Sequence, residues 1–136
     1  MSEQSPQESC ACQAAPKLIF ACSGAADVGR VSDLAARQLT AEGAGKMFCL
    51  AGIGGRVSGI LASTRAAQSI LAIDGCPLDC AKRTLENGGF AEFEHVRLSD
   101  LGLEKGKTAV TEDAVAKVVD AGKARLTASQ VQGGSS

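Results

Sequence analysis

The chain has no tryptophan and no tyrosine, and four phenylalanines are the only aromatic residues among its 136. So few aromatic side chains argue against a surface that stacks nucleic-acid bases and against aromatic-rich binding hot spots. An excess of one charge is missing too, because 14 Lys and Arg are intermixed with 15 Asp and Glu for a net charge of −1. Since nucleic-acid-binding proteins carry a basic patch, we expect no nucleic-acid partner.

Long hydrophobic runs are also absent. No apolar segment approaches the roughly 20 residues that a membrane-spanning helix needs, and the polar residues 1–13 contain no apolar core of a secretion signal. We therefore expect no membrane partner and a cytoplasmic location. A hydrophobic fraction of 45% over 136 residues is enough for one domain with its own core.

The composition changes twice along the chain. Residues 1–15 are rich in Ser, Gln and Glu, and residues 129–136 end in Gly-Gly-Ser-Ser. Both segments are predicted to be flexible, as an N-terminal arm and a C-terminal tail. Residues 16–128 are predicted to form a single α/β domain.

Within this domain, short apolar runs alternate with segments whose apolar residues recur at helical spacing. The predicted strands cover residues 18–21, 47–50, 70–73 and, less apolar than the others, 93–98. Near-continuous apolar strands that alternate with amphipathic helices are typical of a parallel sheet covered on both faces. The expected fold is a three-layer α/β domain, Rossmann-like or flavodoxin-like, with about four parallel strands in the order 2-1-3-4.

Six cysteines are more than packing needs in a chain predicted to be cytoplasmic, where thiols are metal ligands or redox groups rather than disulfides. Cys22, Cys49 and Cys76 each come at the carboxyl end of a predicted strand, and Cys80 follows in the next helix. The carboxyl ends of parallel strands share one edge, where open α/β sheets place their ligands. Helix N-termini at that edge favour thiolates. Four thiolates there could surround one Zn²⁺ tetrahedrally, with Zn–S bonds of about 2.3 Å.

The residues beside the cysteines suggest how the site is built. Pro77 is predicted to be the first residue of the helix, with Cys76 as its N-cap. Asp74 is expected to hold the strand-to-helix turn by hydrogen bonds, and Asp79 to interact with the positive end of the helix. His95 is expected to be a half-exposed strand residue rather than a spare ligand.

Three segments resemble the DGC-domain family, which is named for the motif present here as Asp74-Gly75-Cys76. They are residues 22–29, 49–55 and 73–81, and the resemblance spans about residues 17–103. Members of that family are small bacterial and archaeal proteins described as zinc-binding, with four characteristic cysteines. The resemblance implies that Cys22, Cys49, Cys76 and Cys80 are the ligands of a bacterial zinc protein, and it implies no reaction. Cys10 and Cys12 lie outside the matching motifs and are interpreted as spare thiols rather than a metal relay.

An enzyme that uses a cysteine at this edge is the main alternative. The C-x5-R loop of phosphatases and arsenate reductases is out of register, because Val28 comes six residues after Cys22 and Gly55 six after Cys49. Neither G-x4-G-K-[ST] nor a G-x-G-x-x-G after the first strand is present.

A thiol-based enzyme or carrier stays open. It would handle sulfur, selenium or a soft metal such as Cu(I) through one of the same cysteines, with or without an open metal position. An iron–sulfur cluster ranks below zinc because its usual clustered cysteine spacing is absent. The sequence therefore favours a structural or metal-carrying zinc site over catalysis.

Overall fold

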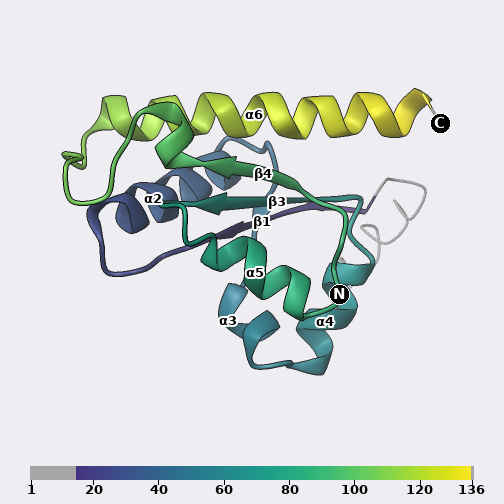
Figure 1. Ribbon diagram of the computed structural model, residues 1–136. Coiled ribbons are helices and arrows are strands. Elements are labelled where there is room, and N and C mark those ends of the chain that lie inside the picture. The colour runs from purple at the N-terminus through teal and green to yellow at the C-terminus, as the bar shows by residue number, and fades with distance from the viewer. Residues whose placement is uncertain (1–14, 136) are drawn as a thin grey trace, which may run out of the picture.

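A computed structural model of the chain describes residues 15–135, and the side chains of residues 15–128. Four strands pair in parallel in the order β2-β1-β3-β4 (Figure 1). They are β1 (Lys17–Ala21), β2 (Lys46–Met47), β3 (Ser69–Asp74) and β4 (Glu94–Arg97). The predicted α/β class and the predicted strand order are confirmed.

Helices cover both faces of this sheet, which confirms the predicted three layers. One face carries α2 and α6, and the other carries α3, α4 and α5 (Figure 1). The helices are α2 (Asp27–Ala41), α3 (Leu50–Gly54), α4 (Ser58–Arg65), α5 (Cys80–Asn87), the 3-10 helix η2 (Leu98–Leu101) and α6 (Glu112–Ser135).

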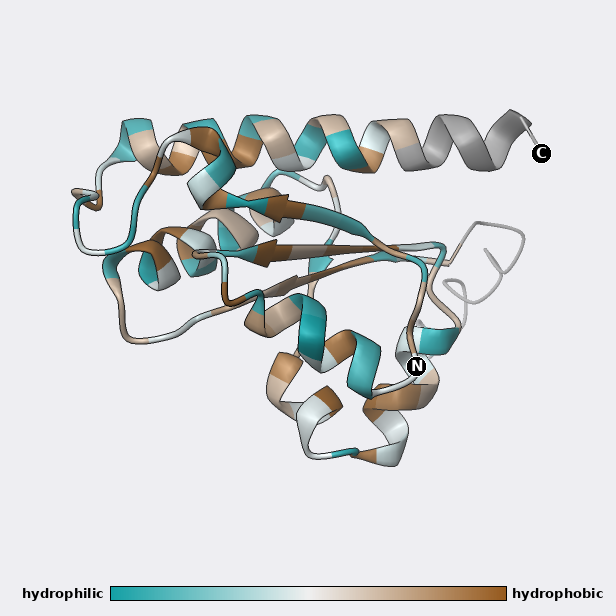
Figure 2. Ribbon diagram, in the orientation of Figure 1, coloured by the Kyte–Doolittle hydropathy of each residue, from teal (hydrophilic) through white to brown (hydrophobic). Residues whose placement is uncertain are grey.

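The two central strands are buried on both sides. In β1, Ile19 packs into the core under α2 and α6, whereas Leu18 and Phe20 pack into the core on the opposite face. In β3, Leu71 and Ala72 divide between the same two cores. This double burial explains why both strands are continuous hydrophobic runs, drawn brown in Figure 2.

The second βα unit departs from the prediction. The strand expected over residues 47–50 contains only Lys46–Met47, and two short helices, α3 and α4, follow it. Arg56 separates them in a left-handed conformation with a φ of 57°, which no helix can continue through. Its guanidinium donates to the Asn87 carbonyl oxygen at 3.2 Å, which ties this break to the end of α5.

The helix after β3 also begins later than expected. Pro77 does not start it, and Cys76 is not its N-cap; α5 begins at Cys80 and its N-cap is Asp79. Residues 76–79 instead form a turn in which the Asp79 N–H donates to the Cys76 carbonyl oxygen at 3.1 Å. Because Asp79 has a left-handed φ of 55°, helical geometry can begin only after it.

At the C-terminal side, Thr111 caps α6, because its Oγ1 accepts a hydrogen bond from the Ala114 N–H at 3.1 Å. The backbone of α6 continues to Ser135, and the flexibility of residues 129–136 stays a prediction. Residues 1–14 of the predicted arm, including Cys10 and Cys12, lie outside the described residues. Between residues 15 and 135, none of the helices combines the length and the apolar character that crossing a bilayer requires.

Candidate metal centre

The sheet register places three of the predicted ligands at the same edge. Ile19 of β1 pairs with Met47 of β2, so that Cys49 comes two residues beyond that pair. Ala21 pairs with Ile73 of β3, and the next residue, Cys22, donates its N–H to the Ile73 carbonyl oxygen at 2.9 Å. Cys76 follows β3 by two residues. All three therefore follow the carboxyl ends of neighbouring strands, which lie about 4.8 Å apart.

Cys80 lies near two of these cysteines. Its thiol is close enough to Cys22, Cys76 and Asp74 to feel their charges. Partial burial is the largest cause that raises the pKa of the Cys80 thiol, although the residue as a whole is exposed, and the charges of Cys22, Asp74 and Cys76 raise it further. A cation beside these groups would reverse that electrostatic effect and favour the thiolate.

Cys49 is set apart from this group. It is the N-cap of α3, it is exposed, and no side-chain hydrogen bond caps the helix there. It lines an open groove of about 520 Å³, together with Ser23, Asp33, Arg37 and Thr84 among others. The four cysteines thus divide into a group of three and Cys49, which no described interaction joins to the others.

The sulfurs do not form a closed site as they are placed. Within the described side chains, one group of three or more His, Cys, Asp or Glu has all its ligand atoms within 4.8 Å of one another, and it consists of Asp74, Asp79 and His95. Sulfurs around a tetrahedral zinc ion are about 4 Å apart. Closing around an ion would therefore need side-chain rotation, and the assignment of the four cysteines as ligands stays a prediction.

Asp74 fastens the start of α5 from within the core. Its carboxylate is fully buried, and its Oδ1 accepts a hydrogen bond from the Ala81 N–H at 2.6 Å while Oδ2 accepts one from the Lys82 N–H at 3.0 Å. A carboxylate suits this position because helix N-termini present free N–H groups and partial positive charge. The prediction that Asp74 holds the strand-to-helix turn is confirmed.

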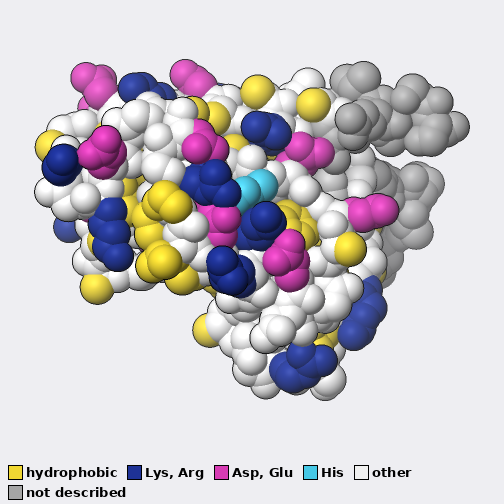
Figure 3. Space-filling view, viewed as in Figure 1, with side chains coloured by type: hydrophobic (Ala, Val, Ile, Leu, Met, Phe, Trp, Pro, Cys, Tyr) yellow, Lys and Arg dark blue, Asp and Glu magenta, His cyan; other side chains and the backbone are white. Residues whose placement is uncertain are grey.

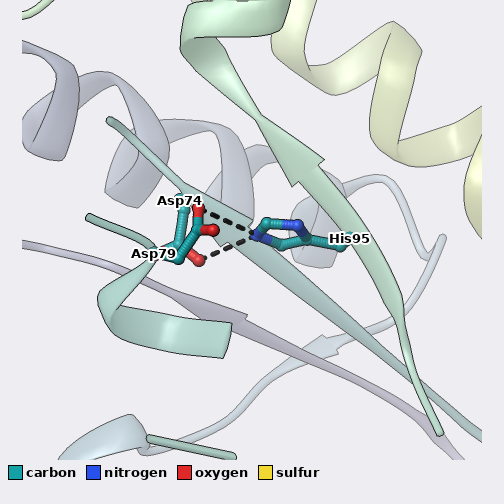
Figure 4. Close-up of side chains that lie close together, drawn as sticks. All are labelled: Asp74, Asp79 and His95. Atoms are coloured by element: carbon teal, nitrogen blue, oxygen red, sulfur yellow. Dashed lines mark hydrogen bonds and ion pairs between the residues drawn. The ribbon is translucent and has the colours of Figure 1, made fainter. Parts of the chain in front are cut away.

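His95 completes the partners of Asp74. Its Nε2 lies 2.8 Å from Asp74 Oδ2 and 3.8 Å from Asp79 Oδ1 (Figure 4). The side chain is 20% exposed, so the prediction of a half-exposed strand residue is correct, but its contact with a buried carboxylate was not predicted. In Figure 3 the histidine, in cyan, reaches the surface among basic and acidic side chains.

Asp79 pairs with Arg97. Arg97 Nε donates to Oδ1 at 2.8 Å and Nη2 donates to Oδ2 at 2.7 Å, a two-pronged ion pair. Asp79 is the N-cap residue of α5 but its side chain makes no capping hydrogen bond, and the predicted interaction with the positive end of the helix stays a prediction. The bond from Arg97 is the main cause that holds the pKa of Asp79 below its usual range, and burial partly opposes it.

Two glycines let the cysteine turns pack closely on α2. A Cβ on Gly75 would lie 2.8 Å from Val28 Cγ2, and a Cβ on Gly29 would lie 2.5 Å from the Gly24 carbonyl oxygen. Both distances are too short for a real side chain. The turns that carry Cys22 and Cys76 therefore hold their positions against the N-terminal turn of α2.

Comparison with known proteins gives two matches and one absence. The DGC-domain family model matches residues 18–121. The anaerobic and virulence modulator AnvM of Pseudomonas aeruginosa is 36% identical over 99 residues, which cover 71% of this chain and 76% of that protein. No solved structure matches the chain.

Proposed function

The chain belongs to the DGC-domain family, and from this premise we propose that it binds one zinc ion through Cys22, Cys49, Cys76 and Cys80 as a structural or metal-carrying protein. The observation that carries the proposal is that these cysteines follow the carboxyl ends of neighbouring strands at one sheet edge, with the Cys80 thiol near Cys22 and Cys76. None of the four is engaged in a disulfide.

The donor set fits a thiophilic ion. Thiolates select Zn²⁺ or Cu(I) over the hard cations that prefer oxygen ligands. Four thiolates with Zn²⁺ carry a net charge of −2, and the N-termini of α2 and α5 follow the cysteine turns and offset part of it. Each thiol must lose its proton when the metal binds, so that zinc affinity falls as the pH falls.

The free-energy cost of the side-chain rotation that closes the site is small compared with the free energy of metal binding. Moving an exposed cysteine away from its preferred χ1 angle costs about 1 kcal/mol. Structural zinc sites in small peptides contribute about 10–16 kcal/mol at neutral pH. Because Cys49 and Cys80 are exposed, their side chains can turn without disturbing the core.

A second candidate is a thiol-based carrier or enzyme, and the exposure of Cys49 favours it. If Cys49 did not bind the ion, three thiolates would leave one position open for water or substrate, as in catalytic zinc sites. The groove beside Cys49 would then be where a substrate enters. The name of the relative describes a modulator and no reaction, which favours the non-catalytic role.

Elemental analysis of protein purified without added metal tests the proposal. We expect about one zinc per chain, lost in each of Cys22→Ser, Cys49→Ser, Cys76→Ser and Cys80→Ser, because a four-thiolate site needs every ligand. Cys10→Ser and Cys12→Ser are the matched controls and should keep the metal. Full zinc in all four site variants would refute the proposal, whereas loss in every variant except Cys49→Ser would favour the open, three-ligand site.

A further inference from the structure

The turn that carries two of the proposed ligands is tied to the neighbouring strand β4. The sheet register pairs Ala72 with His95 and Asp74 with Arg97. Since residues two apart in a strand share a face, His95 and Arg97 point to the same side of the sheet. From that side they reach Asp74 and Asp79, which flank the turn bearing Cys76.

We propose that His95 and Arg97 are positioning residues of the metal site, which hold the segment from Asp74 to Cys80 in the backbone conformation that presents Cys76 and Cys80 to one ion. The inference rests on the proposed zinc function and adds two residues that touch no ligand atom. Neither belongs to the cysteine motifs of the sequence.

Arg97 acts through the backbone of Asp79. A left-handed conformation is unfavourable for residues other than glycine, and aspartate tolerates it better than most. In that conformation the Asp79 N–H closes the turn on the Cys76 carbonyl oxygen, and the next residue is Cys80. Arg97 donates to both carboxylate oxygens of Asp79 and so holds its backbone conformation. That conformation determines how Cys76 and Cys80 are oriented relative to each other.

His95 acts through the buried carboxylate of Asp74. Two of the three hydrogen bonds at that carboxylate come from the first turn of α5, at Ala81 and Lys82, and the third comes from His95. The carboxylate therefore holds the first turn of α5 in place, and with it the position of Cys80. Outer partners that orient metal ligands in this way typically change metal affinity 10- to 100-fold when removed.

The same strand offers a matched control. Glu94, at the start of β4, pairs with Arg125 of α6 at 3.8 Å. This pair also joins β4 to a neighbouring element through an arginine and a carboxylate, but at the opposite end of the strand from the cysteines. Arg125→Gln therefore controls for the loss of an arginine charge and of an ion pair to β4 at a distance from the cysteines.

The test uses the full chain and the variants Arg97→Gln, Arg97→Lys, His95→Leu, His95→Gln and Arg125→Gln. Three quantities are measured: the rate at which a chelator removes zinc, the sulfur-to-metal charge-transfer spectrum with Co²⁺, and amide hydrogen exchange at Ala81 and Lys82 in the metal-free protein. Arg97→Gln and His95→Leu should release zinc about 10-fold faster or more, change the Co²⁺ spectrum and speed the exchange of both amides. Arg97→Lys and His95→Gln should restore part of each effect, and Arg125→Gln should match the wild type.

The outcomes separate this inference from the proposed function. If the wild type binds zinc and Co²⁺ but Arg97→Gln and His95→Leu release zinc at the wild-type rate with an unchanged spectrum, the positioning role is refuted and the zinc function stands. Equal changes in Arg125→Gln would refute it as well. A wild-type chain that takes up neither metal would refute the proposed function, and the positioning role would fall with it. Variants too unstable for study are replaced by the conservative pair, which must still differ from Arg125→Gln.

Discussion

The two halves of the cysteine-bearing edge are built differently. On the β3 side, the turn before α5 is fixed by a buried carboxylate, a histidine and a two-pronged ion pair. On the β2 side, the strand has two residues, and Cys49 follows it as an exposed N-cap without a side-chain hydrogen bond. On that side the Phe48 N–H donates to the Ile19 carbonyl oxygen, and the Phe48 ring packs edge-on against Phe20.

This difference indicates a site of which one half is preorganised and the other adjusts. Cys76 and Cys80 lie on a turn whose backbone is held by hydrogen bonds and an ion pair. The side chain of Cys49, in contrast, can rotate toward an ion at a small cost in free energy. Changes on the β3 side are therefore expected to have larger effects than changes on the β2 side.

The largest effect is expected from Asp74→Ala. The substitution leaves the buried N–H of Ala81, the partly buried N–H of Lys82 and the His95 ring without their acceptor. Hydrogen bonds to a buried charged group contribute about 1.5–3 kcal/mol each, and unpaired buried donors are costly. We expect the free energy of unfolding, measured by urea denaturation of the metal-free protein, to fall by about 3 kcal/mol or more. A loss below about 1 kcal/mol would contradict the assigned role of this carboxylate.

A pair of glycine substitutions compares the two halves directly. Gly75→Ala places a methyl group 2.8 Å from Val28 Cγ2, and overpacking of this kind costs about 1–3 kcal/mol. Gly54→Ala, in α3 on the β2 side, meets only Thr84 Cγ2 at 3.7 Å and replaces a helical glycine. Urea denaturation should show a destabilised Gly75→Ala and a neutral or slightly more stable Gly54→Ala. Equal destabilisation of the two variants would contradict the proposed difference between the β3 side and the β2 side.

Acid sensitivity should depend on Asp79. Because Arg97 lowers its pKa in the folded state, the stabilisation is fully present above the ordinary value of about 3.9 and is lost as the pH falls through the lower folded value. The free energy of unfolding of the metal-free protein should therefore decline below about pH 4. In Asp79→Asn, which keeps the tolerance for a left-handed φ, the decline should be smaller. If the free energy of unfolding fell with pH in the same way in both proteins, the Asp79–Arg97 pair would not contribute to acid sensitivity.

The smallest effect is expected at the ion pair between Asp33 and Arg37, which lines the groove beside Cys49. The two residues lie one turn apart on α2, with Arg37 Nε 2.7 Å from Asp33 Oδ2, and the arginine side chain is 66% exposed. Exposed pairs of this kind contribute about 0.3–0.5 kcal/mol and are screened by salt. Arg37→Gln should change the free energy of unfolding by less than about 0.5 kcal/mol, and a loss above about 1 kcal/mol would contradict a weak, exposed pair.

The central strands and the shared edge could be predicted because their signals are local. Leu18 to Ala21 and Ile70 to Ile73 are continuous apolar runs, which is what burial on both faces requires. Each is followed within three residues by a cysteine. Once a parallel sheet was expected, the common edge followed from topology alone.

The fastening of the site could not be predicted, because it depends on pairing between distant segments. Arg97 reaches Asp79 because the sheet register sets it opposite Asp74, and a register between strands leaves no periodic trace in either segment. The start of α5 was misplaced for a related reason. Proline at position 77 is compatible with a first helical turn, but the left-handed Asp79, paired with Arg97, delays the helix to Cys80.

X-ray absorption at the zinc edge of the zinc-loaded full chain tests the central claim most directly. A site made by Cys22, Cys49, Cys76 and Cys80 predicts four sulfur neighbours at about 2.3 Å. A first shell of nitrogen or oxygen at about 2.0–2.1 Å would contradict it and would point instead to the neighbouring group of Asp74, Asp79 and His95.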